Sequence, residues 1–337
     1  MGKCNFEVGK MKVALVQEKL PAYREKLFID LQKELNIDFF ASTDNAPGLH
    51  YSRISVFKFL TVRISILPIS IISYNRIILE ANIRDLTVVM LSLLFPSKVV
   101  LWGNWKTGRV TDIFRVFLSK WCSRSIYYSD HHQMQFDPFQ KRSVVANNTI
   151  AISAGGFKKV ASDFVIGFLG SVNKRKGLED LLKLLNDLID SGYKVDLNII
   201  GDGDYLDKLM ELALYKQNSV RIHLLGRVED ENELSRLIQN CSVIVSPKQA
   251  GLSIAHTFAC GRPFICYENA ISGGEKYNII NGINGFRSTD YYELKSHVIY
   301  LLESKKLLLT MCHNSKKYYE SNMSADNFIK NVKLILR

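Results

Sequence analysis

The sequence predicts an α/β protein with two doubly wound domains, each a parallel sheet covered by helices. Short apolar runs alternate with longer segments of helical apolar spacing, and strands that alternate with helices form parallel sheets. This pattern restarts after residue 150, and 337 residues is the length of about two domains. At 47% hydrophobic residues, the chain has enough apolar material for large cores, which excludes gross disorder.

The first half of the chain is expected to hold five strands and three helices. The expected strands are short apolar runs: Met11–Val16, Ile37–Ala41, Arg76–Glu80, Val99–Leu101 and Ser125–Tyr128. The expected helices have helical apolar spacing: Ala22–Leu35, Leu86–Phe95 and Ile113–Cys122. Two uncharged runs, 64–75 and 86–97, are shorter than the roughly 20 residues that span a bilayer, so we expect them to be buried as strands and helices.

The second half repeats the pattern after a small-residue stretch, Ile150–Ala161, whose Gly155-Gly156 pair is typical of a hinge. Its expected strands are Phe164–Leu169, Val195–Ile200, Val220–Leu225, Ser242–Val245 and Pro263–Cys266. Its expected helices are Leu178–Ser191, Tyr205–Tyr215, Glu231–Gln239, Ile254–Cys260 and most of the chain from Tyr291 onward. In such sheets, ligands bind at the carboxyl ends of the strands.

The positive charge is concentrated in the first half of the chain, and this limits the classes of binding partner that we expect. Of the net charge of +11, residues 1–150 contribute 20 Lys and Arg against 12 Asp and Glu. A basic first half suggests phosphorylated ligands or an anionic membrane surface, although a merely basic soluble protein is the plain alternative. No zinc finger, RNA-binding aromatic signature or long basic run is present, so nucleic acid is not an expected partner.

Cysteine usage and the first residues indicate the compartment. The six Cys residues are scattered without a CxxC pair, which favours reduced thiols in the cytoplasm over disulfides or a zinc ribbon. The opening residues lack the apolar core of a secretory signal, and Phe6 stands where myristoylation needs Ser or Thr. We therefore expect a cytoplasmic protein.

Several common chemistries are disfavoured by missing motifs. The first strand ends at Gln17 without the glycine of a dinucleotide-binding turn, and Gly201-Asp-Gly203 lacks the third glycine, so a tight turn is the simpler interpretation. GxSxG, HExxH and Walker motifs are absent from the sequence. Asp130-His131-His132 looks metal-like, but adjacent side chains on an extended segment point to opposite faces, so we expect no metal site.

Phe168–Asp180 is the most informative stretch for ligand binding. A strand ends at Gly170, where the missing side chain would let a ligand approach the backbone. A helix is expected to begin near Gly177, and between them lie three cations: Lys174, Arg175 and Lys176. Basic side chains beside a helix start are suited to a diphosphate. A solvated basic loop is the alternative interpretation.

A second ligand loop is expected in Val245–Phe264. A strand ends at a Ser-Pro turn, and Gly251 precedes a short helix whose first N–H groups, around Ala250–Ser253, are free to meet phosphate. His256 lies near the start of that helix. A lone helical His is more often structural, but the glycines that bracket this one favour a place in the ligand loop.

In the first half, Trp102, Trp105, Lys106 and Arg109 form an aromatic and basic loop at an expected strand end. Such a loop could stack a sugar on an aromatic ring and hold a phosphate near Lys106 or Arg109. Ordinary packing with a solvated tail is the alternative.

The order of these motifs resembles the nucleotide-sugar domain of GT-B glycosyltransferases, and more narrowly the retaining family 4, or group 1, enzymes. The resemblance covers roughly residues 164–286. It is carried by Gly170 with Lys176-Gly177, Ile200–Gly203, Leu225–Val228, Ser246-Pro247 with Gly251, Ala259–Pro263 and Asn281–Gly285. The first half is similar more weakly, through Leu20–Arg24, Leu101–Gly103 and Asn148-Thr149. The resemblance implies two Rossmann-like domains that face each other across a cleft: 1–155 for the acceptor and 156–337 for the nucleotide sugar, with the last helix packed back on the first domain.

The sequence departs from the family at four positions. Two Glu residues eight positions apart, one for the donor sugar and one for the ribose, are replaced by Lys248 and His256. Ser171 stands in place of an Arg, and Asn104 in place of a frequent His. An imidazole still hydrogen-bonds a ribose hydroxyl, and Lys248 would favour phosphate or an acidic sugar. The substitutions also allow a weak or inactive domain.

The resemblance implies three groups of site residues and no essential metal. Lys176, His256 and Lys248 are expected at the chemistry. The donor is expected to contact Gly170, Ser171, Lys174, Gly201, Gly203, Arg227, Val228, Gly251, Leu252, Ser253 and Glu275. The acceptor is expected near Tyr23, Arg24, Asn104, Trp105, Lys106 and Arg109.

The implied function is transfer of a hexosyl group, with retention, from a UDP- or GDP-linked sugar. The implied acceptor is an oligosaccharide, lipid-linked at the inner face of the cytoplasmic membrane, in the synthesis of capsule, O-antigen or other lipopolysaccharide. Two alternatives remain open at the level of sequence: a GT-B-type nucleotide-sugar epimerase, and a non-catalytic partner that binds a nucleotide sugar or polysaccharide in an envelope assembly complex.

Overall fold

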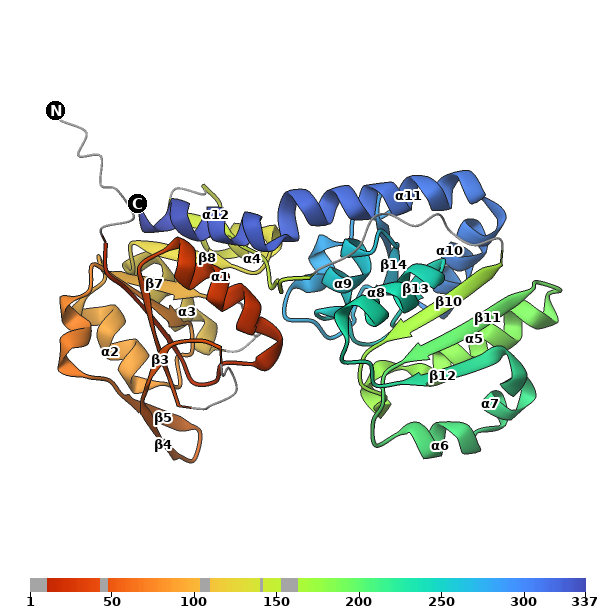
Figure 1. The fold of residues 1–337 in the computed structure, drawn as a ribbon, viewed down its shortest axis with the longest axis horizontal. Helices are drawn as coiled ribbons and strands as arrows, with labels where there is room; N and C mark the ends of the chain where they lie inside the picture. The colour runs from red at the N-terminus through yellow and green to blue at the C-terminus, as the bar shows by residue number, and fades with distance from the viewer. Residues whose placement is uncertain (1–10, 43–47, 104–109, 140–141, 153–162) are drawn as a thin grey trace. The chain divides into compact units, whose positions relative to one another are not determined.

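The computed structural model describes residues 11–42, 48–103, 110–139, 142–152 and 163–337. The chain forms two compact units, Met1–Ala151 with Ala325–Arg337, and Ile152–Ser324 (Figure 1). The first ten residues and the expected Gly155-Gly156 hinge lie outside the described residues. Within the described residues, no helix has the length and apolar character needed to cross a membrane.

The first unit is built on a seven-stranded parallel sheet with the order β3-β2-β1-β6-β7-β8-β9. The strand order reverses direction next to β1, as in doubly wound folds. The bounds are β1 Val13–Gln17, β2 Ile37–Ala41, β3 Tyr51–Arg53, β6 Arg76–Glu80, β7 Val99–Trp102, β8 Arg124–Tyr127 and β9 Ser143–Val145.

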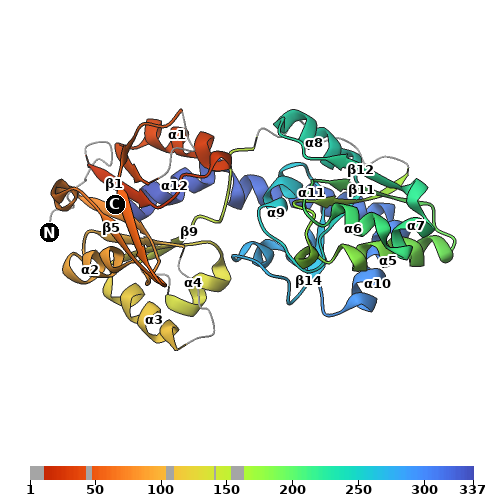
Figure 2. The same cartoon turned by 90° about the horizontal axis from the view of Figure 1, so that it is seen from below.

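Helices cover both faces of this sheet (Figure 2). Alternate strand residues point to opposite faces, so Leu15 and Ile78 pack in one core and Val16 and Leu79 in the other. Helices α1 (Glu25–Glu34) and α12 (Ala325–Leu336) cover the first face. The second is covered by α2 (Leu86–Leu94) and α3 (Thr111–Trp121). The shorter helices are η2 Ala22–Arg24, η3 Ile69–Ser73 and α4 Asp130–Phe136.

A two-stranded antiparallel hairpin projects from the first unit beside α2 (Figure 1). It consists of β4 (Ser55–Phe59) and β5 (Val62–Ile66). At its turn, Leu60 takes a positive φ of 53°, a conformation that costs a side-chain-bearing residue about 1–2 kcal/mol. The sequence pattern did not predict this hairpin.

The second unit has a six-stranded parallel sheet with the order β12-β11-β10-β13-β14-β15. Its strands are β10 Phe164–Leu169, β11 Val195–Ile200, β12 Ile222–Gly226, β13 Val243–Val245, β14 Phe264–Tyr267 and β15 Gly285–Ser288. The order again reverses beside the first strand of the unit. The predicted fold class, α/β with doubly wound parallel sheets, is confirmed in both units.

Helices also cover the two faces of the second sheet. The core on one face includes α5 (Leu178–Asp190) and α10 (Tyr291–Glu303), and the core on the other includes α8 (Glu231–Asn240) and α9 (Ser253–Ala259). The remaining elements are η4 Lys174–Lys176, α6 Leu206–Glu211, α7 Ala213–Gln217, η5 Ser219–Arg221, η6 Glu275–Asn278, α11 Lys305–Tyr318 and η7 Tyr319–Met323.

Two expectations about local structure were wrong. Asp130-His131-His132 is not extended but begins α4, because the Ser129 hydroxyl accepts the His132 N–H and caps the helix. The apolar runs 64–75 and 86–97 are not wholly buried: Ile66, Ile69 and Leu94 are more than half exposed. Strands β3, β9 and β15 were not predicted, since runs as short and as polar as Tyr-Ser-Arg in β3 and Gly-Phe-Arg-Ser in β15 carry little apolar signal.

Candidate functional site

Glycines bring together two loops at the carboxyl edge of the second sheet. A Cβ on Gly201 would lie 1.9 Å from the carbonyl oxygen of Gly170, and one on Gly203 would lie 2.2 Å from that of Val172. Gly170 N–H donates to Ile200 O at 3.0 Å, and Val172 N–H to Asp202 O at 2.9 Å. The glycines after β11 therefore let the backbone of the 170–173 loop pack directly on the 201–203 loop.

Lys176 is buried just below this loop. The Asn173 side chain accepts the Arg175 N–H and caps the η4 turn, which leaves Lys176 only 8% exposed. A Cβ on Gly170 would lie 3.3 Å from its ammonium nitrogen, so the cation sits against the open face of that glycine. Burial lowers the pKa of Lys176, the Arg175 cation lowers it further, and the Glu275 carboxylate opposes both.

Glu275 provides the acidic counterpart of Lys176. It begins η6 and is only 4% exposed. The Ser272 hydroxyl donates to its Oε2 at 2.8 Å, and a Cβ on Gly273 would lie 3.3 Å from both carboxylate oxygens. The turn before η6 thus closes around the carboxylate. A buried lysine and a buried glutamate, electrostatically coupled, lie behind the glycine loop.

Lys248 lies on the other side of the Lys176 turn. Its backbone N–H donates to Lys176 O at 3.2 Å, and its side chain packs where a Cβ on Gly177 would stand. Its ammonium reaches the Asp180 carboxylate at 3.1 Å. The Tyr267 hydroxyl donates to the same carboxylate oxygen at 3.0 Å. Burial is the main cause that raises the pKa of the Tyr267 phenol, and the nearby Asp180 carboxylate raises it further. Asp180 and Tyr267 were missed in the sequence, where they look like an ordinary helix-start acid and a strand end.

A surface pocket of about 500 Å³ opens next to Lys248 within the second unit. Its lining combines cations, carboxylate, amide and phenol groups, so it can receive a polar ligand. The residues that line it are Arg175, Lys248, Tyr267, Asn269, Ile271, Thr289, Asp290 and Tyr291.

The second expected ligand loop lies after β13. A Cβ on Gly251 would meet nothing within 4 Å, so the loop is open at that point. Leu252 and Ser253 are half-buried, and Ser253 begins α9. His256 lies one turn into α9, and burial lowers its pKa to about 4, which makes its imidazole neutral at pH 7. A neutral imidazole both donates and accepts a hydrogen bond.

The other expected donor contacts lie on the rims of these loops. Ser171 is exposed and accepts from the Asn173 amide at 2.9 Å, and Lys174 points to solvent. Arg227 follows β12, where it is exposed and pairs with Glu229 at 3.1 Å. Val228 packs against the core that contains α8 and α9. The contacts therefore bring together Gly170, Lys176, Lys248 and Glu275, with Ser171, Lys174 and Arg227 at the periphery.

In the first unit, Arg24 is the best-positioned expected acceptor residue. It is buried, hydrogen-bonds the Asn148 side chain and stacks its guanidinium 5.4 Å from the centre of the Trp102 ring. Tyr23 beside it is 54% exposed. The other four expected acceptor residues, Asn104, Trp105, Lys106 and Arg109, lie outside the described residues.

Glu80, at the carboxyl end of β6, is a candidate that the sequence did not single out. Its side chain is exposed by accessible area, yet desolvation by the surrounding protein raises the pKa of its carboxyl, while the cations Arg63 and Arg24 counteract the shift. Arg63 is ion-paired with Glu18, which follows β1. In the sequence, a Glu at the end of a strand does not by itself indicate a site, because the charged residues that surround it come from other elements. Within the described residues, no three His, Cys, Asp or Glu side chains group as they would around a metal ion.

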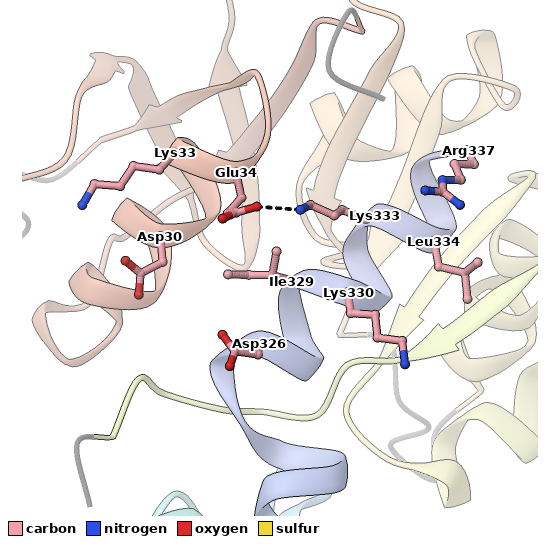
Figure 3. Close-up of a pocket in the computed structure, with 9 residues that line it drawn as sticks. All are labelled: Asp30, Lys33, Glu34, Asp326, Ile329, Lys330, Lys333, Leu334 and Arg337. Atoms are coloured by element: carbon pink, nitrogen blue, oxygen red, sulfur yellow. Dashed lines mark hydrogen bonds and ion pairs between the residues drawn. The ribbon is translucent and has the colours of Figure 1, made fainter. Parts of the chain in front are cut away.

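A second hollow, of about 780 Å³, lies between α1 and α12 in the first unit (Figure 3). Its lining mixes acidic and basic side chains, two of which, Lys333 and Glu34, form an ion pair at 2.6 Å. Its lining comes from the two helices rather than from loops at the carboxyl edge of the sheet. We therefore do not place the functional site there.

Comparisons with known proteins relate this chain to glycosyltransferases. Residues 154–318 match the family model of glycosyl transferases group 1. The capsular polysaccharide biosynthesis glycosyltransferase CapM of Staphylococcus aureus is 24% identical over 203 residues, which is 59% of this chain. The match spans about half of the length of that relative, 50%.

Solved structures share the fold over nearly the whole chain. Anabaena Alr3699/HepE, solved in complex with UDP, has a TM-score of 0.68 at 16% identity, over 96% of this chain and 98% of that one. The lipopolysaccharide outer core galactosyltransferase WaaB has a TM-score of 0.68 at 12% identity, over 96% and 99%. A glycosyltransferase from Rickettsia africae has a TM-score of 0.69 at 13% identity, over 97% and 98%.

Proposed function

We propose that this chain transfers a hexosyl group from a nucleotide sugar to a surface polysaccharide, because residues 154–318 match the model of group 1 glycosyl transferases and solved glycosyltransferases share the fold. The proposed donor is a UDP- or GDP-linked sugar. The proposed acceptor is a lipid-linked oligosaccharide of capsule, O-antigen or other lipopolysaccharide, reached at the cytoplasmic face of the membrane. The names of CapM and WaaB, which belong to capsule and lipopolysaccharide synthesis, support this choice of pathway.

One observation carries the proposal: a buried lysine lies against an open glycine face at the carboxyl edge of the sheet. Lys176 and Gly170 together form a place where a diphosphate can approach the backbone and meet a fixed cation. Because the ammonium is already desolvated, it needs little reorganisation to stabilise charge that develops on a leaving diphosphate. The coupled Glu275 carboxylate favours the charged form of the lysine.

The proposed reaction exchanges one bond at the anomeric carbon. The bond from this carbon to the diphosphate oxygen breaks, and a bond to an acceptor hydroxyl oxygen forms on the same face, so configuration is retained. The electron pair of the broken bond leaves with the diphosphate, beside Lys176. The acceptor proton passes to a leaving phosphate oxygen, which balances the step without a metal ion.

Lys248 and His256 define the donor preference in this proposal. Lys248 forms an ion pair with Asp180 and lines the polar pocket, so it is available for a phosphate or an acidic sugar. His256, neutral at pH 7, is suited to hydrogen-bond a ribose hydroxyl. Arg24, held between Trp102 and Asn148, is the proposed anchor for phosphate or sugar on the acceptor side.

The first test is nucleotide binding with two matched lysine variants. Thermal unfolding is followed with UDP, GDP, CMP and their sugar conjugates, since a ligand of the folded state raises Tm. We expect UDP or GDP to raise Tm, Lys176→Ala to abolish the shift, and Lys216→Ala, an exposed lysine of α7 outside the donor loops, to retain it. No shift with any nucleotide would refute the donor site.

A second candidate function is favoured by the side chains of Lys248 and His256, which replace acidic residues of the resembled family. It is a non-catalytic partner that binds the nucleotide sugar without turnover. Product analysis separates the two: transfer predicts a glycosylated acceptor, and the partner predicts binding with no product. A changed sugar nucleotide without any acceptor would instead indicate an epimerase.

A further inference from the structure

The hairpin β4–β5 turns its polar side chains toward the first unit and most of its apolar side chains toward solvent. On the face turned toward the unit, Val56 packs against the core and the Ser65 hydroxyl donates to Asp85 at 2.5 Å, while the backbone N–H of Ser65 donates to Thr87 Oγ1 at 3.0 Å. Lys58 and Arg63, paired across the strands, both form ion pairs with Glu18. These contacts hold the ribbon with one fixed side inward.

The outward face of the same ribbon is apolar. Phe57 opposes Ile64 and Phe59 opposes Val62 across the two strands, with Ile66 next along β5. Because side chains alternate between faces, all five lie on one side. All are exposed, Phe59 by 78%, and Leu60 at the turn is exposed by 90%. A solvated ribbon would present the opposite pattern, with polar residues outward.

Helices α2 and α3 extend this apolar surface. The exposed residues of α2 recur at helical spacing on one side: Leu86, Met90, Leu93 and Leu94. On α3, Phe114, Phe117 and Trp121 form a stacked ladder with ring centres 6.1 and 5.9 Å apart. The Trp121 indole donates to Leu93 O at 3.3 Å, which joins the two helices, and α2 lies against β5 (Figure 1).

This surface is concentrated in one stretch of the chain. Of the 27 large hydrophobic side chains that are exposed among the described residues, seventeen lie between Phe57 and Trp121. Single exposed apolar residues are ordinary, but a continuous apolar face on a monomer marks an interaction site. We call the apolar residues of β4, β5, α2 and α3 given above, with Ile113, the apolar face.

The charges around the apolar face select its partner. Residues 51–124 contain eleven Lys and Arg but three Asp and Glu, which is the whole positive excess of residues 1–150. Arg84 and Lys120 are exposed on or beside these elements, whereas Lys58 and Arg63 are ion-paired with Glu18. Of the acids, Asp85 is buried as the cap of α2 and Asp112 lies beside Arg115. Two copies of this chain, docked through this face, would bring like charges together.

We propose that the apolar face inserts into the surface of an anionic lipid bilayer, with the basic residues at the level of the headgroups. Apolar area contributes by leaving water, and each nearby Lys or Arg adds attraction to anionic lipid. The inference deepens the proposed function, because it gives the route by which a lipid-linked acceptor is reached. It is tested by membrane binding alone.

The experiment is flotation of the full chain with vesicles. Vesicles of phosphatidylethanolamine with phosphatidylglycerol are compared with vesicles of phosphatidylcholine, at low and high salt. The test variant is Phe59→Ser, Leu94→Ser and Ile113→Ser, one exposed residue from each of β4, α2 and α3. The control carries Phe139→Ser, Val220→Ser and Tyr292→Ser, which are equally exposed but lie outside the apolar face.

We expect binding to the anionic vesicles, weakened by salt, that falls about a hundredfold in the test variant and stays within about twofold in the control. Equal binding by both variants would overturn the proposal. So would the absence of vesicle binding together with a concentration-dependent dimer that the test variant loses, which would assign the face to a second copy. UDP binding, measured on the same preparations, reports separately on the proposed function.

Discussion

The ammonium of Lys248 lies 3.1 Å from the carboxylate of Asp180, which stands in the first turn of α5. The loop after β13 is thereby tied to the helix that follows the Lys176 turn. A lysine at position 248 thus has a local partner, whereas a glutamate there would face a like charge. Lys248 stands where the similar family has a Glu, and Asp180 on α5 provides the opposite charge for it.

Lys248→Glu is expected to lower the free energy of unfolding by about 0.5–1 kcal/mol, because it places two carboxylates together. The effect is small because the two side chains are 49% and 26% exposed and solvent screens them. Adding Asp180→Asn should recover most of the loss. Urea unfolding of the single and double variants measures both values, and a single variant as stable as the wild type would show that the pair does not couple.

Lys176→Met together with Glu275→Gln is expected to separate stability from activity. The double change removes the buried ammonium and the buried carboxylate that compensates it, so no unpaired charge is left inside the protein and Tm should change little. The rate of sugar transfer should fall about a hundredfold or more, since the cation beside the leaving diphosphate is lost. Tm and product formation are measured on the same sample. A lower Tm with normal transfer would assign Lys176 a structural role.

Gly201→Ala is expected to be among the most destabilising changes in the second unit, at about 3 kcal/mol or more. Its φ is +143°, and a Cβ would stand 1.9 Å from the Gly170 carbonyl oxygen, so backbone must move. Gly192→Ala is the matched control: its φ is +87°, but a Cβ there meets nothing within 4 Å. We expect about 1 kcal/mol for that change, from conformational strain alone. Chemical denaturation of the two variants provides the comparison.

Stability is expected to fall as the pH decreases from about 6.5 to 4. Burial lowers the pKa of both His132 and His256 to about 4, so the folded state favours the neutral rings. Their contribution is complete above the unfolded pKa, near 6.5, and is lost as the pH falls through the folded value. Each histidine contributes at most about 3 kcal/mol.

His132→Gln should flatten this pH dependence, because it removes one of the two titrations. The free energy of unfolding is measured across the same pH range for wild type and variant, with His313→Gln, an exposed histidine of α11, as the control. A wild-type curve that stays level between pH 6.5 and 4 would contradict the expectation.

The alternation of strands and helices in both units could be predicted from the sequence alone. Apolar periodicity is a local property, and it was strong in runs such as Phe164–Leu169 and Leu178–Asp190. The Lys174–Lys176 turn was located in the same way, since it falls between a strand end and a helix start. What remained beyond reach were the short, partly polar strands β3, β9 and β15, the hairpin β4–β5, and the side on which an apolar run faces.

Only the tertiary structure decided which distant residues meet. Lys248 with Asp180, Arg24 with Trp102 and Asn148, and Glu275 with Lys176 are joined across elements that are far apart in the chain. The outward side of the hairpin was decided by contacts from Glu18 and Thr87 to its polar residues. The alternation of apolar and polar residues predicts only that one face of a hairpin is apolar. Which face meets solvent depends on these partners from elsewhere in the chain.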